Sequence, residues 1–131
     1  MLIILFETGQ ANHFRLAAKV RSEYSIERYV EETKHLYSVL ESRLSTHAWL
    51  AGNKYTIADI ASFCWVRNAE LIQIDLNEFP NVKNWVAKIE SRDAASRGIS
   101  LPPSVTSPQE RRELFAAMRS KIDVMKNTDR Y

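Results

Sequence analysis

The sequence is poor in the residues that interrupt or cross-link a chain. Its 131 residues contain three glycines, four prolines and one cysteine. So few turn-forming residues argue against a β-rich domain with many tight turns and favour long helices. The single cysteine, Cys64, excludes a framework of disulfides and a zinc site built from several cysteines.

Long apolar runs are also missing. The run at residues 1–6 is far shorter than the roughly 20 apolar residues that span a bilayer. It also lacks the basic flank and the core of about 7–15 residues of a secretory signal. We therefore expect a cytoplasmic protein without a membrane segment or a leader, and we interpret residues 1–6 as the apolar start of a helix.

Neither sign of charge dominates. The chain has 18 basic and 16 acidic side chains, and the excess falls within residues 107–131, which hold six basic and four acidic ones. Nucleic-acid-binding proteins usually carry a clustered basic face, so no nucleic-acid partner is expected. With 45% hydrophobic and 26% charged residues, the composition is typical of one globular domain.

The strongest helical pattern covers residues 26–44, where apolar side chains recur at every third or fourth position. Ser25 is expected to cap this helix, and the charged residues between the apolar ones, Glu41 included, to form a solvated face. Further helices are predicted over residues 10–20, from Pro80 to Ile89 and over residues 93–98. Gly98 is expected to be the glycine that ends the last of them. The patterns together predict an all-α domain.

Thr56 and Asp59 have the spacing of a capping box, in which each side chain accepts a hydrogen bond from the other residue's backbone. This role explains Asp59 without a catalytic function. The helix that follows, over residues 57–72, is apolar almost all round, which predicts a buried central helix. Cys64 lies in it and is expected to pack in the core, where a thiol keeps a high pKa.

The end of the chain is predicted to be separate from the rest. Residues 101–104 have the composition of a linker, and Ser107, Pro108 and Glu110 form a second set of helix-start signals. The apolar stripe of this extra C-terminal helix consists of Leu114, Phe115, Met118, Ile122 and Met125.

Motifs with a defined chemistry are not found. The sequence has no phosphate-binding glycine loop, no HExxH or CxxC pair and no nucleophile elbow. His13, His35 and His47 are too scattered to indicate a metal site, so no metal is expected. The aromatic residues either pack the core or line an apolar pocket between helices. Composition and spacing alone therefore lead no further than a helical domain.

Four blocks of residues add a family resemblance. Residues 49–52, followed by the capping box and Ala61, resemble the C-terminal helical domain of glutathione transferases, whose central helix opens with such a box. Residues 9–14, 26–40 and 79–85 are similar to the branch that contains bacterial nu-class and fungal nitrogen-regulator-like transferases. The resemblance covers residues 9–103. It implies a remnant or altered segment at residues 1–8 and a tail at residues 104–131.

The resemblance implies a function in two alternative forms. In the first, glutathione is the cosubstrate, and the chain forms the dimer seam and the pocket for a hydrophobic electrophile. The reaction is conjugation or glutathione-dependent isomerisation, in detoxification or fungal secondary metabolism, by a homodimer. The family's thiolate-activating residue lies in an N-terminal thioredoxin-like domain, which this sequence does not show. In the second form, the chain is a non-catalytic module for dimerisation or protein interaction.

Candidate site residues also follow from the resemblance. Arg28 matches an arginine that reaches glutathione across the dimer. A guanidinium suits this role because it pairs with a carboxylate in bidentate fashion; the alternative is a surface pair with Glu31 or Glu32. The positions that match the border of the electrophile pocket are Gln10, Asn12, His13, Trp65 and Arg67.

Overall fold

The protein is described by a computed structural model at residues 2–100 and at positions 110, 113 and 117. Its elements are α1 (Leu2–Asn12), a π-helical turn η1 (His13–Ala17), α2 (Glu23–Thr46), α3 (Ile57–Val66), two short 3₁₀ turns η2 (Ala69–Ile72) and η3 (Leu76–Glu78), α4 (Pro80–Glu90) and α5 (Asp93–Ile99). Across these residues no strand forms, and one isolated bridge joins Trp49 to Gly52. The all-α prediction is confirmed.

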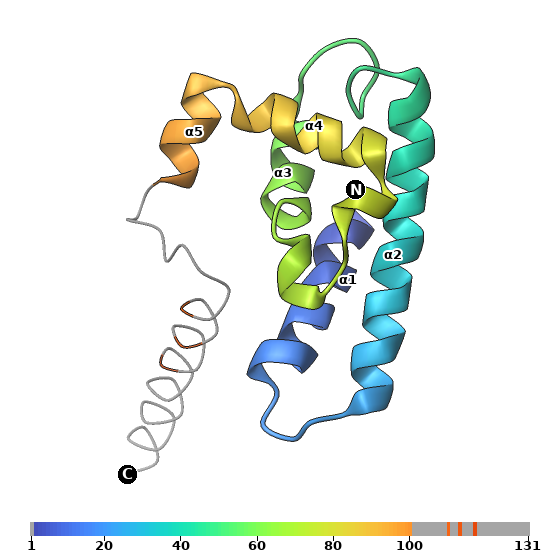
Figure 1. Ribbon diagram of the computed structural model, residues 1–131, viewed down its shortest axis with the longest axis vertical. Coiled ribbons are helices and arrows are strands. Elements are labelled where there is room, and N and C mark those ends of the chain that lie inside the picture. The colour runs from blue at the N-terminus through green and yellow to red at the C-terminus, as the bar shows by residue number, and fades with distance from the viewer. Residues whose placement is uncertain (1, 101–109, 111–112, 114–116, 118–131) are drawn as a thin grey trace.

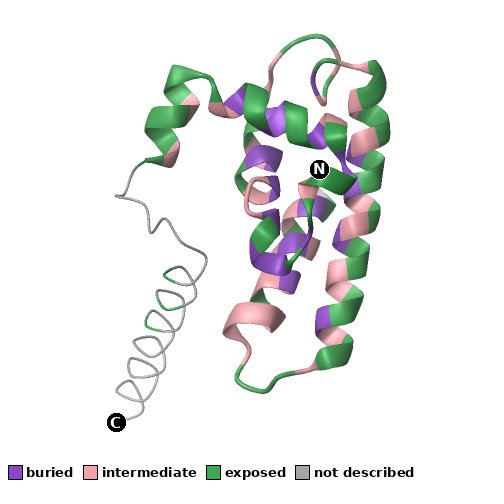
Figure 2. Ribbon diagram, in the orientation of Figure 1, coloured by how far each residue is buried: buried purple, intermediate pink, exposed green. Residues whose placement is uncertain are grey.

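The core lies where α1, α2, α3 and α4 meet. Figure 1 shows α1 beside α2, and α4 lying across the upper ends of α2 and α3. The buried positions of α2 and α4 face the other helices, whereas α5 is mostly exposed (Figure 2). Fully buried side chains from five elements fill the centre: Ala11, Tyr37, Val66, Ile72, Val82 and Ile89.

The first helix joins two predicted segments, and the interpretation of residues 1–6 as the start of a helix is confirmed for the described residues 2–6. Residues 2–12 form one continuous α-helix, so the predicted remnant at residues 1–8 and the start of the predicted helix 10–20 share one element. Ile4, Thr8 and Ala11 are buried at helical spacing, which gives the apolar start of the chain a place in the core. The helix then widens into the π turn, where the Ala18 N–H donates to the His13 carbonyl at 2.7 Å.

The long helix α2 has a different cap from the expected one. Ser22 is its N-cap, and the Ser22 hydroxyl accepts a hydrogen bond from the Ser25 N–H at 3.3 Å. The prediction that Ser25 is the cap is wrong because the apolar period starts at Ile26, one turn inside the helix. The two serines are three residues apart. Because serine is a preferred N-cap residue, residue type alone does not show which of them is the cap.

The helix α3 is shorter and less buried than predicted. It ends at Val66 and the chain continues through the turn η2, so the predicted helix 57–72 is broken. Ile57 is 78% exposed and Ile60 is 48% exposed, and Cys64 is exposed as well. The predictions of burial all round and of a core position for Cys64 are therefore wrong. Neighbouring elements cover the opposite face, which carries Asp59, Ser62, Phe63 and Val66.

The capping box at the start of α3 is confirmed. The Thr56 hydroxyl accepts from the Ala58 N–H at 3.2 Å, and Asp59 Oδ2 accepts from the Thr56 N–H at 2.9 Å. The other oxygen, Asp59 Oδ1, accepts from the Leu50 N–H at 3.0 Å and from Trp85 Nε1 at 2.9 Å. One fully buried carboxylate thus joins the 47–56 loop, α3 and α4.

The loop over residues 47–56 is held by backbone and aromatic contacts. Trp49 and Gly52 exchange two backbone hydrogen bonds, and Gly52 has a φ of +114°, a conformation that favours glycine. The Trp49 and Tyr55 rings meet edge to face with centroids 5.0 Å apart. Lys88 of α4 lies over the Trp49 ring, with its ammonium 3.9 Å from the centroid. These contacts fix the loop against α4.

The start of α4 is capped from another helix. Pro80 opens α4, as predicted, but the N-cap residue Phe79 offers no side-chain cap. Glu41 of α2 fills this role, because its carboxylate accepts from the N–H groups of Asn81 and Val82, both at 3.0 Å. Glu41 therefore bridges α2 and α4. The sequence had instead suggested that Glu41 belongs to a solvated face.

The end of the described chain differs in one detail from the prediction. The short helix over residues 93–98 is confirmed as α5, but it runs on to Ile99, so Gly98 lies inside it and Ser100 is the C-cap. The predicted linker at 101–104 and most of the tail helix lie outside the described residues. Glu110, Glu113 and Ala117 are described, and each is helical. In the described part of the chain, no helix has both the length and the apolar character that a membrane span needs.

Candidate functional site

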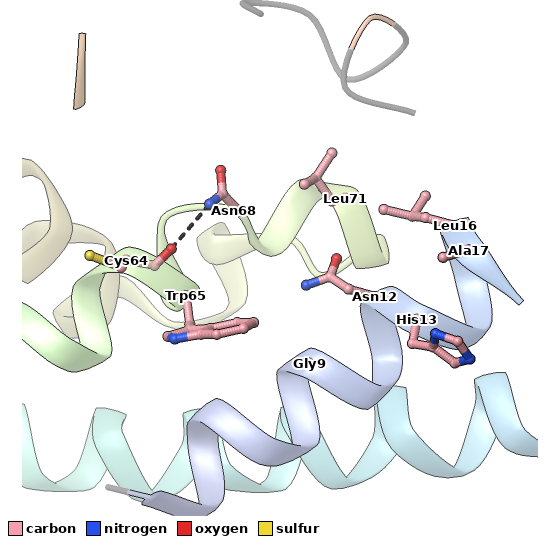
Figure 3. Close-up of a pocket in the computed structure, with 9 residues that line it drawn as sticks. All are labelled: Gly9, Asn12, His13, Leu16, Ala17, Cys64, Trp65, Asn68 and Leu71. Carbon is pink, nitrogen blue, oxygen red and sulfur yellow. Dashed lines mark hydrogen bonds between the residues drawn. The ribbon is translucent and has the colours of Figure 1, made fainter. Parts of the chain in front are cut away.

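A cavity of about 490 Å³ opens where the end of α1 and the π turn face α3 and η2. Its size falls within the usual range of roughly 300–1,000 Å³ for small-molecule sites. Figure 3 shows its walls, which combine apolar side chains with two amides. The lining residues are Gly9, Asn12, His13, Leu16, Ala17, Cys64, Trp65, Asn68 and Leu71.

The indole of Trp65 forms the floor of this cavity. Figure 3 shows the ring above α1 at Gly9, with its other face turned toward the side that carries Asn68 and Leu71. A Cβ on Gly9 would lie 3.6 Å from Trp65 Cζ3, an ordinary van der Waals distance, so α1 supports the ring directly. A flat aromatic surface is therefore presented to any occupant.

The Asn12 amide projects from the last residue of α1 into the space beside the Trp65 ring (Figure 3). Its Oδ1 is buried and accepts no hydrogen bond from the described residues. Its amide nitrogen points toward the cavity in Figure 3. The nitrogen is therefore a hydrogen-bond donor that a bound molecule could use.

The π turn supplies the apolar wall opposite Trp65. Leu16 and Ala17 of η1 and Leu71 of η2 line the cavity. The wider turn shifts side chains from the positions that a continuous α-helix would give them, and such turns are frequent at functional sites. His13 begins this turn, but its ring is exposed and meets Phe14 edge to face at 5.2 Å.

The rim on the α3 side consists of Cys64 and Asn68. Asn68 Nδ2 donates to the Cys64 carbonyl at 3.1 Å, so its amide nitrogen is engaged. Figure 3 shows the Cys64 sulfur pointing away from Asn12 and His13. Sequence reasoning missed both residues as site candidates, and the apolar sequence around Cys64 gave no signal that this position faces outward.

Two of the five predicted pocket residues lie outside this cavity. Gln10 is two residues before Asn12 on α1, and Arg67 is two residues after Trp65. A step of two residues turns a side chain to another side of a helix. Arg67 Nε instead lies 3.6 Å from Glu90 Oε1. The structure thus brings together Asn12, His13 and Trp65, and it places Gln10 and Arg67 elsewhere.

Arg28 lies apart from the cavity, exposed on the first turns of α2. A hydrogen bond with Tyr24 raises the pKa of Arg28, and the charge of Glu7 on α1 adds to this. The alternative partner Glu31 lies 3.6 Å from Lys34 Nζ. The guanidinium therefore faces solvent near the junction of α1 and α2.

The cavity contains few groups that could transfer a proton. Among the residues that line it, His13 and Cys64 are the ones whose side chains can give up or accept a proton. Nearby in the core, burial raises the pKa of Tyr37 well above its usual value, so this phenol stays protonated. Within the described residues, no three His, Cys, Asp or Glu side chains are grouped to hold a metal ion. The geometry is that of a binding pocket.

Comparison with known proteins identifies the family. The family model described as "Glutathione S-transferase, C-terminal domain" matches residues 8–93. This match covers more than half of the chain, runs from the second half of α1 through α4, and includes all residues that line the cavity. The chain belongs to the glutathione S-transferase C-terminal domain family. The resemblance drawn from the sequence is confirmed at this level.

Individual proteins of known structure or curated name are also similar to this chain. The disulfide-bond oxidoreductase YfcG of Escherichia coli is 46% identical over 91 residues, which are 70% of this chain and 42% of that protein. A glutathione transferase of Burkholderia graminis, with two glutathione molecules bound per subunit, is 38% identical with a TM-score of 0.67 and covers 76% of this chain and 45% of that one. Ure2p in complex with S-hexylglutathione is 31% identical with a TM-score of 0.67, over 71% and 47% of the two chains. The chain thus spans less than half the length of these relatives.

Proposed function

We propose that the chain is the helical part of a glutathione-dependent enzyme and that its cavity holds the apolar group that reacts with, or is already joined to, glutathione. One observation carries this proposal: the cavity lies within the matched family domain and is lined by Asn12, His13 and Trp65, three of the positions that the resemblance implied. Its remaining walls are mainly apolar, as an apolar ligand requires.

The chemistry proposed for the whole protein rests on its relatives. The solved structures named above contain glutathione or an S-alkyl derivative, and the YfcG protein is named a disulfide-bond oxidoreductase. Conjugation, glutathione-dependent isomerisation and thiol–disulfide exchange all use the thiolate of glutathione as the nucleophile. Because the cavity has no evident thiolate-stabilising group, that group is proposed to come from the part that these relatives have beyond the match.

The remaining parts of the proposal concern the setting of the protein. The similarity to Ure2p and YfcG supports the assignment to the nu-class and nitrogen-regulator-like branch. We propose that the protein is a homodimer and that it is located in the cytoplasm. We also propose that the chain is divided into residues 1–8, 9–103 and 104–131. Roles in detoxification and in fungal secondary metabolism stay predictions from the sequence.

The first prediction tests the cavity as the site of the apolar group. S-Hexylglutathione is expected to bind the chain about tenfold more tightly than S-methylglutathione. Part of its longer hydrocarbon chain is buried in the cavity, and each buried CH₂ contributes about 0.8 kcal/mol to the binding free energy. Trp65→Ala should remove most of this advantage. Isothermal titration calorimetry measures both ligands.

Phe6→Ala is the control for Trp65→Ala. Phe6 is an aromatic residue of α1 that is 58% exposed and does not line the cavity. This variant should keep the advantage of the hexyl ligand. Equal binding of the two ligands by the unsubstituted chain, or no binding of either, would contradict the proposed function.

The second prediction concerns Arg28, proposed to contact a glutathione carboxylate across the dimer. Arg28→Ala is expected to weaken S-hexylglutathione binding about tenfold, the effect of one charge-assisted hydrogen bond. Lys34→Ala is the matched control, since it removes a partly exposed cation of the same helix that pairs with Glu31. If both variants bind like the unsubstituted chain in calorimetry, the role of Arg28 is wrong.

A non-catalytic interaction module is the second candidate, favoured by the apolar residues that α1 and α3 leave exposed. Ile3 and Phe6 are each 58% exposed, and Ile57 and Ile60 of α3 are exposed as well. Such residues are typical of a surface that another protein part covers. A chain that binds neither glutathione derivative would favour this alternative.

A further inference from the structure

The outer side of α3 carries apolar residues that the described residues leave uncovered. Ile57 is 78% exposed, Ile60 is 48% exposed, and Cys64 is exposed as well. These three residues follow each other at steps of three and four, so they form one stripe along most of the helix, called here the α3 stripe. A stripe of this kind is the face against which a second amphipathic helix packs.

Such a helix is predicted at the end of the same chain. Its apolar residues, called here the tail stripe, are Leu114, Phe115, Met118, Ile122 and Met125. Glu110, Glu113 and Ala117 are helical and exposed, and Leu114 and Met118 each follow one of these three directly. One step along a helix turns a side chain by about 100°. The tail stripe therefore belongs to a different side of the predicted helix from the exposed one.

The described chain ends near enough to α3 for its continuation to reach the α3 stripe. The Arg92 guanidinium lies 4.1 Å from the centroid of the Tyr55 ring, and Tyr55 is two residues before Ile57. The helix α5 begins directly after Arg92, and its seven residues extend about 10 Å. Residues 101–106 then lead to the predicted helix start at Ser107 and can span about 20 Å.

Figure 1 agrees with this connection, because α5 lies on the side of α3 that is away from α2. A short tether also gives the tail a high effective concentration at α3, which favours contact within the chain over contact between chains. The tail is therefore a better occupant of the α3 stripe than a second copy of the protein.

We propose that the C-terminal helix of this chain docks on the outer side of α3, with the tail stripe packed against Ile57, Ile60 and Cys64. This inference concerns an interface within the chain. It does not rest on the proposed function, because neither glutathione nor the cavity takes part in the contact.

The single cysteine of the chain makes the contact measurable without a label. Docking should shield Cys64 from N-ethylmaleimide, a neutral thiol reagent. In the double variant Phe115→Gln, Met118→Gln of the 131-residue chain, the tail stripe loses two apolar side chains and no charge is added. Its Cys64 is expected to react about tenfold faster than that of the unsubstituted chain, as for a tail docked about nine-tenths of the time.

A second double variant is the matched control. Glu113→Gln, Ala117→Gln introduces the same number of glutamines into the same predicted helix, but on its exposed side. Cys64 should therefore keep the slow rate of the unsubstituted chain. The urea midpoint of each variant checks that the helical domain is folded.

Nuclear magnetic resonance of the unsubstituted chain measures the contact itself. Two of the three methionines, Met118 and Met125, belong to the tail stripe. In a chain with labelled methionine and isoleucine methyl groups, nuclear Overhauser effects are expected between these methionines and Ile57 or Ile60.

The possible outcomes decide the inference in either direction. Faster reaction of Cys64 in the tail-stripe variant alone, together with the methyl contacts, supports it. Equal rates in all three proteins overturn it, since the tail stripe then does not shield Cys64. Protection that increases with protein concentration, with methyl contacts between differently labelled chains, also overturns it and assigns the α3 stripe to a second copy. Binding of S-hexylglutathione is tested separately, so none of these results decides the proposed function.

Discussion

Asp59→Ala is expected to lower the free energy of unfolding by about 4 kcal/mol, the combined effect of a lost cap and several buried donors left without partners. The side chain is fully buried and accepts from the N–H groups of Leu50 and Thr56 and from Trp85 Nε1. Each unsatisfied buried donor costs about 1–3 kcal/mol. Urea unfolding followed by circular dichroism measures the loss.

Two further variants show whether the carboxylate has this role. Asp59→Asn keeps the size but replaces one acceptor oxygen by an NH₂ group, which faces a donor on whichever side it lies, so it should be nearly as damaging. Trp85→Phe removes one donor, and in a double-mutant cycle it should show coupling to Asp59. A loss below about 1 kcal/mol in Asp59→Ala would mean that the carboxylate acts as a simple cap and nothing more.

Glu41→Ala is expected to cost about 2–3 kcal/mol, because it removes the charged acceptor at the start of α4. The carboxylate accepts from the Asn81 and Val82 N–H groups at 3.0 Å and from Asn81 Nδ2 at 2.6 Å. A negative charge at a helix N-terminus is also favoured by the helix dipole. Urea unfolding again provides the measurement.

The controls for Glu41 use its own helix. Glu41→Gln retains one acceptor oxygen without the charge and should lose about half as much free energy as Glu41→Ala. Glu32→Ala removes an exposed carboxylate of α2 and should stay within about 0.5 kcal/mol of the unsubstituted chain. If Glu41→Ala and Glu32→Ala are equally mild, the contact between α2 and α4 does not stabilise the fold.

These two carboxylates show how far the sequence could predict the fold. The period of residues 26–44, the Thr56–Asp59 box and Pro80 are local signals, and each predicted a feature that the structure has. The partners of Glu41 and the contact of Asp59 with Trp85 join residues that are far apart in the sequence. No local pattern encodes such pairs, so Glu41 looked like part of a solvated face.

What the sequence left open in α1 and what it predicted wrongly in α3 have a related cause. Apolar content predicted that the helix from Ile57 is buried, but burial depends on which elements cover each face, and in the described structure Ile57 and Ile60 remain exposed. Residues 1–6 were interpreted as a helix start, but this segment has no clear period, so the sequence did not show that Ile4 and Thr8 share the buried face of one helix with Ala11. Tertiary packing decided both cases.

The site was predictable only in part. Asn12 and Trp65 were named through the family resemblance, and the structure places both at one cavity. Leu16, Ala17 and Leu71 were missed, because apolar residues that line a pocket look like core residues in a sequence. The π turn, which sets the position of Leu16 and Ala17, has no signature in the sequence that we could identify.

The account depends most on the claim that this cavity binds the apolar group of a glutathione derivative. The direct measurement is a titration of the ¹⁵N-labelled chain with S-hexylglutathione, followed by nuclear magnetic resonance, with the indole signal of Trp65 assigned through Trp65→Phe. The account predicts that the Trp65 indole N–H and the Asn12 side-chain amide shift most, and that Trp49 and Trp85, away from the cavity, hardly change. Shifts confined to the exposed face around Ile57 and Ile60, with the Trp65 and Asn12 signals unmoved, would contradict it.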